Sequence, residues 1–569
     1  MFPYEPVVRA SAGAYSGVAL VGTHSTIIGW SFDDTALRDG LKGFAIRRTE
    51  FSKSTDEVLE LKWLGGHKRF RSEDNGQACD VGSLTAPFQR FRWNDYTLNA
   101  RRYYRYEVFP MRGAPGQLTR DEVPLVFEFS PTPEDDGDLG IYVNRGVTAA
   151  KAYFQRFGDT HPSKVDPPNA AYNWLSRGLK ESLLGFIASA QSGDALHVAV
   201  YEFHDTEIAK ALKDAIARNV EVLIVHDAKP GKNSTKESKH IVAEFDLGNF
   251  VIERTKVNIS HNKLVILLRN NSPVRAWTGS ANFSENAFHY QSNTGLVVTD
   301  VNAVQNFENY FQGFVDKPTK AESKDRNRAL MDRINQLPNR MAEKTFFSPI
   351  RQLDILDTSV DLISTAERMV LISGPFGVDK RMISAMKAND GAIIEYGLAN
   401  ATAQKKIAGL NHHNTRFFPP KKLKTYQNER WDAKAFGAHK IHAKTIVVDP
   451  YSDNPKILIG SANFSEASCN DNDENAMLIT GNKRLAAVLA TEFMRMYDHY
   501  KARYYIDLNE QKNREIRKEN KQRVAQDLPP LPENKIDIHL KDDTSWSKTA
   551  YDQNSFSHKF RDRIAFSGQ

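Results

Sequence analysis

The chain of 569 residues is long enough for about three to four domain-sized units, and its composition, 40% hydrophobic and 26% charged, is that of a globular protein. Its net charge of +6, from 76 basic and 70 acidic residues, is compatible with an anionic partner but does not identify one. Two cysteines far apart, Cys79 and Cys469, exclude a disulfide framework and a cysteine zinc site.

The N-terminus, "MFPYEPVVRASAGAYSGVAL", has no charged segment followed by a continuous apolar core, so we expect no cleaved signal peptide. No apolar run approaches the roughly 18 residues that a membrane-spanning helix requires. We therefore expect a soluble protein, not an integral membrane protein, that is cytoplasmic or exported without a cleaved signal peptide.

Residues 1–130 contain short alternating runs rich in β-branched and aromatic residues, which predict an all-β sandwich domain. The runs are "STIIGWSF", "GFAIRRTE", "VLELKWL", "PFQRFRWNDY" and "YYRYEVFPMRG". A Trp strand with Trp30 and a late Tyr-x-Tyr-x-Val strand with Tyr104, Tyr106 and Val108 resemble a fibronectin type III domain. The segment holds no convergent polar cluster, so we assign it no chemistry and no identified partner.

The segment "SPTPEDDGDLG" (130–140) combines Pro, Gly and acidic residues and predicts a linker. After it, "AAYNWLSRGLKESLLGFIASAQ" predicts a helix, "ALHVAVYEF" a buried strand, "TEIAKALKDAIARN" a helix and "VEVLIVHD" another buried strand. The same order recurs in "RMVLISGPF", "DKRMISAMKAN" and "GAIIEYGLA". We therefore predict two α/β/α sandwich halves, residues 140–325 and 326–510, followed by a charged C-terminal extension, residues 511–569.

Two segments of these halves share the pattern H-x-K, an apolar run and the hexapeptide Gly-Ser-Ala-Asn-Phe-Ser. His261 and Gly279 are 18 residues apart (279−261), as are His442 and Gly460 (460−442). The shift between the copies is 181 residues (442−261) at each matched position, without a gap. Such a match indicates duplicated halves related by a pseudo-twofold axis.

Each copy offers donors for a phosphate group. A histidine and a lysine two residues apart on a strand point to the same face, which places His261 with Lys263 and His442 with Lys444. Asn282 and Asn463 add amide donors, and Ser280 and Ser461 are further substrate-binding candidates. A site with two histidines, two lysines and two asparagines favours a phosphodiester over a divalent metal. We expect neither a metal nor a cofactor.

These motifs resemble the signature of the phospholipase D superfamily, H-x-K-x4-D followed by G-S-x-N, over residues 140–510. The resemblance implies the duplicated α/β/α fold, phosphodiester chemistry and a supporting role for the Asp of the motif. The second copy has Asp449 at this position, whereas the first has Leu268. The two halves are therefore expected to be unequal.

Two histidines acting on one phosphodiester suggest covalent catalysis, in which one imidazole attacks phosphorus and the other protonates the leaving alcohol. The halves differ 32 residues after the histidine, where one has Asn293 (293−261) and the other Glu474 (474−442). In the family that these motifs resemble, the acid that hydrogen-bonds to the histidine can come from the other half of the molecule. Such an arrangement would pair Glu474 with His261. We therefore predict His261 as the nucleophile and His442 as the acid/base, and count Asn293 among the substrate-binding residues.

Three functions remain open at this point. A phospholipase D that hydrolyses phospholipid head groups and transfers them to alcohols is favoured by both motifs on one chain and by aromatic segments such as "SGPFG", "RFFPPKKL" and "NAFHY". A nuclease of the same superfamily is favoured by the basic balance and the charged run at 511–523. A non-catalytic binding module is the third alternative.

Two further expectations concern assembly and origin. Because both half-sites lie on one chain, we expect a monomer. Asn282 and Asn463 each begin a formal N-glycosylation sequence inside the predicted site, where a glycan would block catalysis. This disfavours a eukaryotic secretory route and favours a bacterial origin.

Overall fold

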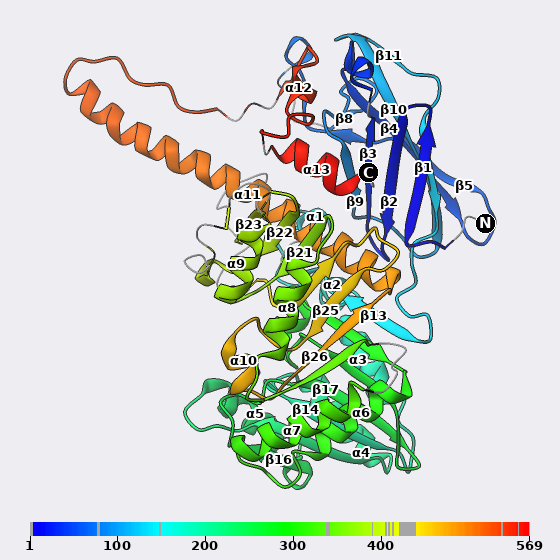
Figure 1. Ribbon diagram of the computed structural model, residues 1–569, viewed down its shortest axis with the longest axis vertical. Helices are drawn as coiled ribbons and strands as arrows, with labels where there is room; N and C mark the ends of the chain where they lie inside the picture. Colours follow the sequence, from blue (N-terminus) through cyan, green and yellow to red (C-terminus); the bar gives the residue numbers. More distant parts are fainter. Residues whose placement is uncertain are drawn as a thin grey trace. The chain divides into compact units, whose positions relative to one another are not determined.

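The computed structural model describes most of the chain in two compact units (Figure 1). The β unit consists of Met1–Pro133, Pro450–Asp453 and Lys483–Gln569, and the duplicated unit of Glu134–Asp449 and Asn454–Asn482. The described residues are 4–32, 34–74, 76, 80–146, 150–336, 342–389, 391–403, 407, 410–411, 415–419, 440–535, 537, 539–555 and 557–567.

The β unit contains two antiparallel sheets, so the predicted all-β sandwich is confirmed. The first sheet has the order β1-β2-β3-β9 and the second the order β11-β10-β4-β5, with β12 also paired to β10. The strands are β1 (Val7–Ala12), β2 (Tyr15–Val21), β3 (Thr26–Phe32), β4 (Gly43–Ser52), β5 (Val58–Trp63), β9 (Arg92–Asp95), β10 (Arg102–Ala114), β11 (Gln117–Arg120) and β12 (Leu125–Phe129). Short strands β6 (Gly65–Gly66) and β8 (Val81–Gly82) pair with each other, as do β7 (Arg69–Phe70) and β27 (His539–Leu540).

Aromatic side chains fill the core between these sheets. Trp30 is fully buried, and its ring meets that of Phe44 edge-on with centroids 5.3 Å apart. The hydroxyl of Tyr104 accepts a hydrogen bond from the backbone N–H of Asn99 at 2.8 Å, which ties the start of β10 to the preceding turn. Both features are typical of a fibronectin type III domain, and that finer resemblance stays a prediction.

The C-terminal residues belong to the same unit. They form α11 (Lys483–Val524), α12 (Ser545–Lys548) and α13 (His558–Phe566). Trp546 packs in the aromatic core and donates from Nε1 to the carbonyl of Leu41 at 3.0 Å. Gly29 lies so close to α13 that a Cβ would stand 1.6 Å from the carbonyl oxygen of Phe566. Residues 545–566, assigned by sequence to a charged extension, are therefore an integral part of the β unit.

The duplicated unit contains two sheets of identical topology. The first has the order β13-β19-β18-β17-β14-β15-β16 and the second the order β20-β26-β25-β24-β21-β22-β23. The last three strands of each order, β14-β15-β16 and β21-β22-β23, are parallel to one another. All other neighbouring pairs are antiparallel. The duplicated α/β fold is thus confirmed strand by strand.

The bounds of these strands are as follows. The first sheet consists of β13 (Leu139–Val143), β14 (Ala195–Val200), β15 (Glu221–Asp227), β16 (Val251–Arg254), β17 (Lys263–Arg269), β18 (Ser272–Gly279) and β19 (Thr294–Val298). The second consists of β20 (Lys344–Ser348), β21 (Met369–Ser373), β22 (Ile394–Leu398), β23 (Thr415–Phe418), β24 (Lys444–Val448), β25 (Lys456–Gly460) and β26 (Glu474–Thr480).

Helices cover both faces of the first sheet. The apolar side chains of α3, α4 and α5 pack with Val198, Ile224 and Val265 of the strands on one face. On the other face, the ring of Phe311 in α6 stacks on His197 of β14 with centroids 4.7 Å apart. The helices of the duplicated unit are α1 (Ala150–Phe157), α2 (Ala170–Ser176), α3 (Leu179–Ala188), α4 (Thr206–Ala217), α5 (Asn233–Glu244), α6 (Val301–Gln312), α7 (Lys320–Ile334), α8 (Asp354–Ser364), α9 (Lys380–Ala388) and α10 (Glu466–Asn470).

The predicted helix over 170–191 is divided in two. Arg177 and Gly178 have φ values of +48° and +86°, so the chain leaves the helical conformation between α2 and α3. Glycine adopts this left-handed conformation without steric cost and typically ends a helix. Of the helices in the described part of the chain, none combines the length and apolar composition needed to cross a membrane.

The two halves meet through the segments that precede their site residues. Ser260 forms a parallel bridge with Asp473, and Ser292 forms the equivalent bridge with Ile441. A buried ion pair crosses the same boundary, with Nε of Arg254 3.0 Å from Oδ2 of Asp473. These contacts fix the histidines of each half against the other half.

Candidate active site

The H-x-K motifs lie at the beginning of equivalent strands. Lys263 begins β17 and Lys444 begins β24, and the histidine of each motif precedes the strand by two residues. In both copies the lysine Nζ donates to the carbonyl of its own histidine, at 2.6 Å for Lys444 and His442. All four side chains are buried. Burial holds each imidazole and each ammonium in one position.

The carboxylate of Glu474 stands behind His261 across the pseudo-twofold axis. Its Oε2 is 2.7 Å from Nδ1 of His261 and also accepts a hydrogen bond from the hydroxyl of Ser461 at 2.8 Å. Asn472 donates to the other carboxylate oxygen at 3.3 Å. With an acceptor at Nδ1, the imidazole carries its proton there and keeps the Nε2 lone pair for a substrate.

His442 has an equivalent but uncharged support. Its Nδ1 is 3.0 Å from Oδ1 of Asn293 and 3.0 Å from the carbonyl of Ser280. Asn293 is itself held by the hydroxyl of Ser280, which donates to Oδ1 at 2.8 Å, and by the carbonyl of Ala287. The Nδ1 atom of each histidine therefore faces a hydrogen-bond acceptor from the position 32 residues after the other histidine. The acceptor is a carboxylate for His261 and a neutral amide for His442.

The Gly-Ser pair of each hexapeptide supports this arrangement. A Cβ on Gly279 would lie 2.2 Å from the carbonyl oxygen of Thr294, and a Cβ on Gly460 would lie 2.3 Å from that of Asn475. Only glycine therefore fits next to the neighbouring strand at either position. Ser280 and Ser461 are fully buried and bind the side chains that back the histidines. The structure therefore places Ser280, Ser461 and Asn293, the predicted substrate-binding residues, behind the histidines as orienting groups.

Each hexapeptide asparagine has a buried amide oxygen, although Asn282 is buried as a whole and Asn463 only in part. Among the described residues, Oδ1 of Asn282 and Oδ1 of Asn463 have no hydrogen-bond partner. The Nδ2 of Asn282 donates to Oε2 of Glu202 at 2.6 Å. Buried polar groups are normally paired, so two amide oxygens without partners, one in each hexapeptide, indicate a ligand position.

An aromatic ring lies beside each histidine. The ring centroids of Tyr201 and His261 are 5.1 Å apart, and those of Phe376 and His442 are 6.2 Å apart. Both rings follow equivalent strands, β14 and β21, and both are half-buried. The site therefore has an apolar wall on each side of its cationic centre.

Burial in the site favours the uncharged forms of its titratable groups. Burial, followed by the ammonium groups of Lys263 and Lys444, lowers the pKa of His261 well below its ordinary value. Burial and the same two lysines lower the pKa of His442. Burial lowers the pKa of Lys263 to about 7, and burial together with Lys263 lowers that of Lys444. An anionic ligand would reverse these shifts, because a nearby opposite charge favours the charged form.

The carboxyl group shifts in the opposite direction. Burial raises the pKa of Glu474 to about 7, against the opposing effect of Lys263. The lowered pKa of His261 and the raised pKa of Glu474 both favour the uncharged forms of this buried pair. A phosphorylated or protonated His261 would be cationic, and the ionised carboxylate of Glu474 would stabilise it.

The Asp of the second motif lies at the far end of its strand. The carboxylate of Asp449 accepts hydrogen bonds from the backbone N–H groups of Glu367, Arg368 and Met369 at 2.8–2.9 Å, which fixes the start of β21. Leu268 is buried at the corresponding end of β17, opposite Ala195 of β14. The replacement of Asp by Leu268 in the first motif therefore changes the contacts at the end of a strand. It leaves the groups that contact the histidines unchanged.

Sequence reasoning missed some residues of the site and overvalued others. Glu202 and Tyr201 follow a buried strand without belonging to the repeated motif, and their signal was the polar pair "YE" at the end of an apolar run. The segment "NAFHY", which the sequence suggests to be loop-like, forms a short π-helical turn in which Ala287, Phe288 and Tyr290 are buried. Cys79 and half of "RFFPPKKL", residues 420–423, lie outside the described residues, and Cys469 is a buried free thiol.

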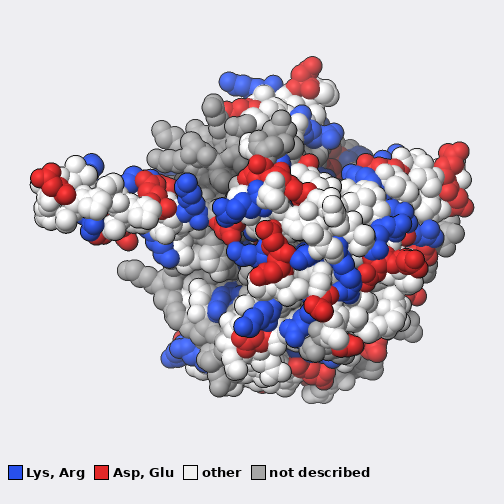
Figure 2. Space-filling model, turned by 90° about the horizontal axis from the view of Figure 1, so that it is seen from above, with Lys and Arg blue, Asp and Glu red and all other residues white. Residues whose placement is uncertain are grey.

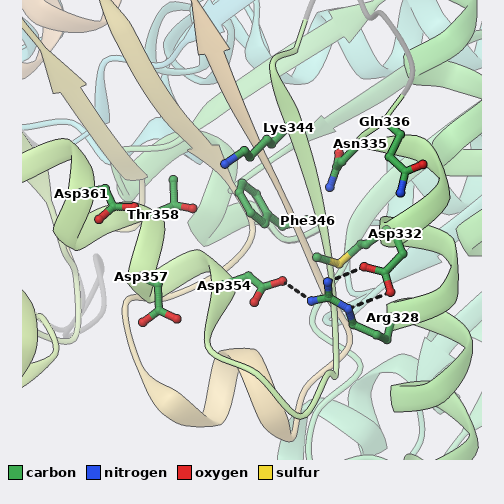
Figure 3. A pocket seen from close by; sticks show the side chains of 11 residues that line it. Arg328, Asp332, Asn335, Gln336, Lys344, Phe346, Asp354, Asp357, Thr358 and Asp361 are labelled. Carbon is green, nitrogen blue, oxygen red and sulfur yellow. Dashed lines mark hydrogen bonds and ion pairs between the residues drawn. The ribbon is translucent and has the colours of Figure 1, made fainter.

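A pocket of about 380 Å³ lies elsewhere in the second half, between α7, β20 and α8 (Figure 3). Arg328 forms ion pairs there with Asp332 and Asp354. None of the lining residues belongs to the two-histidine site. The pocket is therefore separate from the groups described above.

Comparisons with known proteins agree with the duplicated architecture. The family model described as cardiolipin synthase, phospholipase D-like domain, matches residues 183–315 and 360–497. No match was found among the curated proteins.

Three solved structures illustrate the structural likenesses. A phosphatidylserine synthase from Haemophilus influenzae is 12% identical and covers 57% of this chain and 85% of that chain, with a TM-score of 0.41. The phospholipase D family member Nuc from Salmonella typhimurium is 24% identical over 24% of this chain and 87% of that chain, with a TM-score of 0.21. A yeast tyrosyl-DNA phosphodiesterase mutant is 12% identical over 53% of this chain and 85% of that chain, with a TM-score of 0.32.

Proposed function

Because the chain carries the two-segment domain of the phospholipase D superfamily, whose members act on phosphodiesters, we propose that it cleaves phospholipid head groups through a phosphohistidine intermediate. The observation that carries the proposal is the single buried centre formed by His261, His442 and their two lysines, with contributions from both halves. The chemistry follows in two displacement steps.

In the first step, Nε2 of His261 attacks phosphorus and the bond from phosphorus to the leaving oxygen breaks. The protonated His442 donates its Nε2 proton to that oxygen, so the head group departs as a neutral alcohol. Lys263 and Lys444 stabilise the charge on the non-bridging oxygens, together with the amides of Asn282 and Asn463. His442 is left neutral.

In the second step, neutral His442 removes a proton from water or from another alcohol. The resulting oxygen nucleophile attacks phosphorus, the P–N bond breaks and its electron pair returns to Nε2 of His261. Water gives a phosphomonoester, and an alcohol gives a new phosphodiester. Both histidines then have their starting protonation states.

The assignment of the nucleophile rests on the unequal backing of the two imidazoles. Phosphorylation at Nε2 makes the imidazole cationic while Nδ1 keeps its proton. The Oε2 of Glu474 lies 2.7 Å from that atom in His261, whereas His442 has a neutral amide oxygen at 3.0 Å. A carboxylate stabilises the phosphorylated cation more than an amide does, which favours His261 as nucleophile.

The lining of the site and the charge pattern on one face of the molecule both favour a lipid over a polynucleotide. Tyr201 and Phe376 line it with apolar surface. On the face drawn in Figure 2, Lys and Arg are interspersed with Asp and Glu, unlike the single-sign stripe typical of nucleic-acid binding. Within the charged run at 511–523, Arg517 pairs with Glu510 and Glu533 on the exposed part of α11. A solvated helix face accounts for that run.

A parallel assay tests the proposal. Phosphatidylcholine vesicles, plasmid DNA and single-stranded DNA are incubated separately with the protein in EDTA, with and without ethanol. We expect choline release, and ethanol should divert part of the phosphatidic acid to phosphatidylethanol. Degradation of DNA without cleavage of any phospholipid would replace the proposal by the nuclease alternative. No turnover of either substrate class would favour a binding module.

A further inference from the structure

Glu202 places a negative charge in a site otherwise built for an anion. It follows β14, and the backbone of its segment is joined to the first hexapeptide. The N–H of Phe283 donates to the carbonyl of Glu202 at 3.0 Å, and the N–H groups of His204 and Asp205 donate to the carbonyl of Phe283. The position of Glu202 beside Asn282 is therefore fixed by the main chain.

One carboxylate oxygen of Glu202 accepts a hydrogen bond from Asn282. Oε2 accepts from Nδ2 of Asn282 at 2.6 Å, and the residue is half-buried. A carboxylate can accept several hydrogen bonds, so Glu202 keeps acceptor capacity beyond this bond. The carboxylate also raises the pKa of both Lys263 and Lys444, against the effect of burial, so its charge reaches the centre of the site.

The second half is built without such a group. There β21 is followed by Gly374, Pro375 and Phe376, and none of them carries a carboxylate. The fold therefore does not require an acid at this position. A charge present in only one of two duplicated halves indicates a role in recognising an asymmetric ligand.

Glu202 is connected to the surroundings of both histidines, because its neighbour Tyr201 packs beside His261 and its partner Asn282 belongs to the hexapeptide that contacts His442. The Nδ1 of His442 is 3.0 Å from the carbonyl of Ser280, and Asn282, two residues further on, donates to Glu202. In the proposed mechanism His442 protonates the leaving alcohol and deprotonates the entering one. Phosphate oxygens would be repelled by the carboxylate, whereas a hydroxyl or ammonium group would donate to it.

We propose that Glu202 determines specificity by accepting a hydrogen bond from a hydroxyl or ammonium group on the alcohol that leaves or enters the phosphodiester. The inference rests on the proposed function, which it extends to the class of head group. Ethanolamine and glycerol carry such donors, whereas choline and methanol, once esterified to phosphate, carry none. The same charge disfavours a second phosphate next to the scissile one, as in a polynucleotide.

The variants Glu202→Gln and Glu202→Ala separate recognition from the positioning of Asn282. Glutamine keeps an oxygen that can accept from Nδ2 of Asn282 but removes the charge, whereas alanine removes both. Glu221→Gln is the matched control, because Glu221 is an exposed carboxylate at the opposite end of the adjacent strand β15.

The turnover arm measures kcat/KM on vesicles of phosphatidylethanolamine, phosphatidylglycerol and phosphatidylcholine. Glu202→Gln should lose about 10- to 100-fold more on the first two than on phosphatidylcholine, as expected for a hydrogen bond to a charged group. Glu221→Gln should match the wild type on all three. An equal loss on all three lipids in Glu202→Gln, or no loss on any, would overturn the inference.

The binding arm uses calorimetry and needs no turnover. The wild type should bind glycerophosphoethanolamine more tightly than dimethyl phosphate, and Glu202→Gln should bind both equally. This result without phospholipid cleavage would sustain the inference while the proposed function fails. Phospholipid cleavage by a wild type that binds both ligands equally would sustain the function and overturn the inference.

Discussion

Oε2 of Glu474 lies 2.7 Å from Nδ1 of His261, although the two residues are 213 positions apart and belong to opposite halves. The same relationship joins Asn293 to His442 at 3.0 Å. Each half therefore supplies the support for the histidine of the other. A half on its own would hold an imidazole without the group that orients it.

Loss of either histidine should abolish turnover. His261→Ala and His442→Ala each remove a group that the reaction needs, so kcat/KM should fall about 10³-fold or more while the fold is retained. The measurement is head-group release together with circular dichroism. His240→Ala is the control, because His240 is exposed on α5 and should leave activity unchanged. Near-normal activity in either site variant would refute a shared site.

Exchange of the two backing groups should exchange the roles of the histidines. Glu474→Gln should lower kcat by about 10²- to 10⁴-fold, the range for carboxylates that orient a catalytic imidazole. Adding Asn293→Asp to this variant places a carboxylate behind His442. We expect the double variant to regain part of the activity and to carry its covalent phosphate on His442, as mapped by mass spectrometry.

Asn293→Asp alone separates this effect from a general benefit of added charge. It should not raise activity, because His261 already has its carboxylate. The double variant could instead be no more active than Glu474→Gln and carry its phosphate on His261. That result would show that the group at Nδ1 does not decide which histidine is the nucleophile.

The pH profile of kcat/KM should be narrow and centred near neutrality. Burial raises the pKa of Glu474 to about 7, so its carboxylate becomes protonated and loses its support of His261 as the pH falls below that value. Burial lowers the pKa of Lys263 to about 7, so its ammonium is lost as the pH rises. Because kcat/KM reports the free enzyme, both limbs should appear. A flat profile from pH 5 to 9 would contradict these assignments.

The buried ion pair between the halves should be important for stability. The side chains of Arg254 and Asp473 are 1% and 0% exposed, and Asp473 immediately precedes Glu474. Arg254→Ala leaves a buried carboxylate without its partner and should lower the free energy of unfolding by about 3–5 kcal/mol. The control is Arg269→Ala, because the side chain of Arg269 is 46% exposed in its pair with Asp194, and about 0–1 kcal/mol is expected there. Urea unfolding measures both, and equal losses would refute the prediction.

The duplicated fold could be predicted because its signal is local and repeated. The identical spacing from His261 to Gly279 and from His442 to Gly460 fixes the register of two strands in each half without any knowledge of the core. The repeat predicts that the two halves share one fold, and the structure confirms it, whereas the order of the strands is known from the structure alone. The break between α2 and α3 was missed, because helical periodicity continues on both sides of Gly178.

Other features depended on contacts that no short pattern contains. Trp546 completes the aromatic core of the β unit and donates from Nε1 to the carbonyl of Leu41. The two residues are 505 positions apart in the sequence. Ser280 and Ser461 look like substrate ligands from their motif, and only their bonds to Asn293 and Glu474 reveal an orienting role. Glu202 belongs to no repeated motif at all.

The most direct test of the account is to trap the covalent intermediate. The protein is mixed with bis(p-nitrophenyl) phosphate in EDTA, quenched in base within one turnover, digested and mapped by mass spectrometry. The good leaving group needs little protonation, so the His442→Ala variant should still form the adduct and should accumulate it. The account predicts p-nitrophenyl phosphate on His261 in the wild type and in His442→Ala, and no adduct in His261→Ala. Turnover without any covalent adduct, or an adduct that persists in His261→Ala of otherwise native sequence, would contradict it.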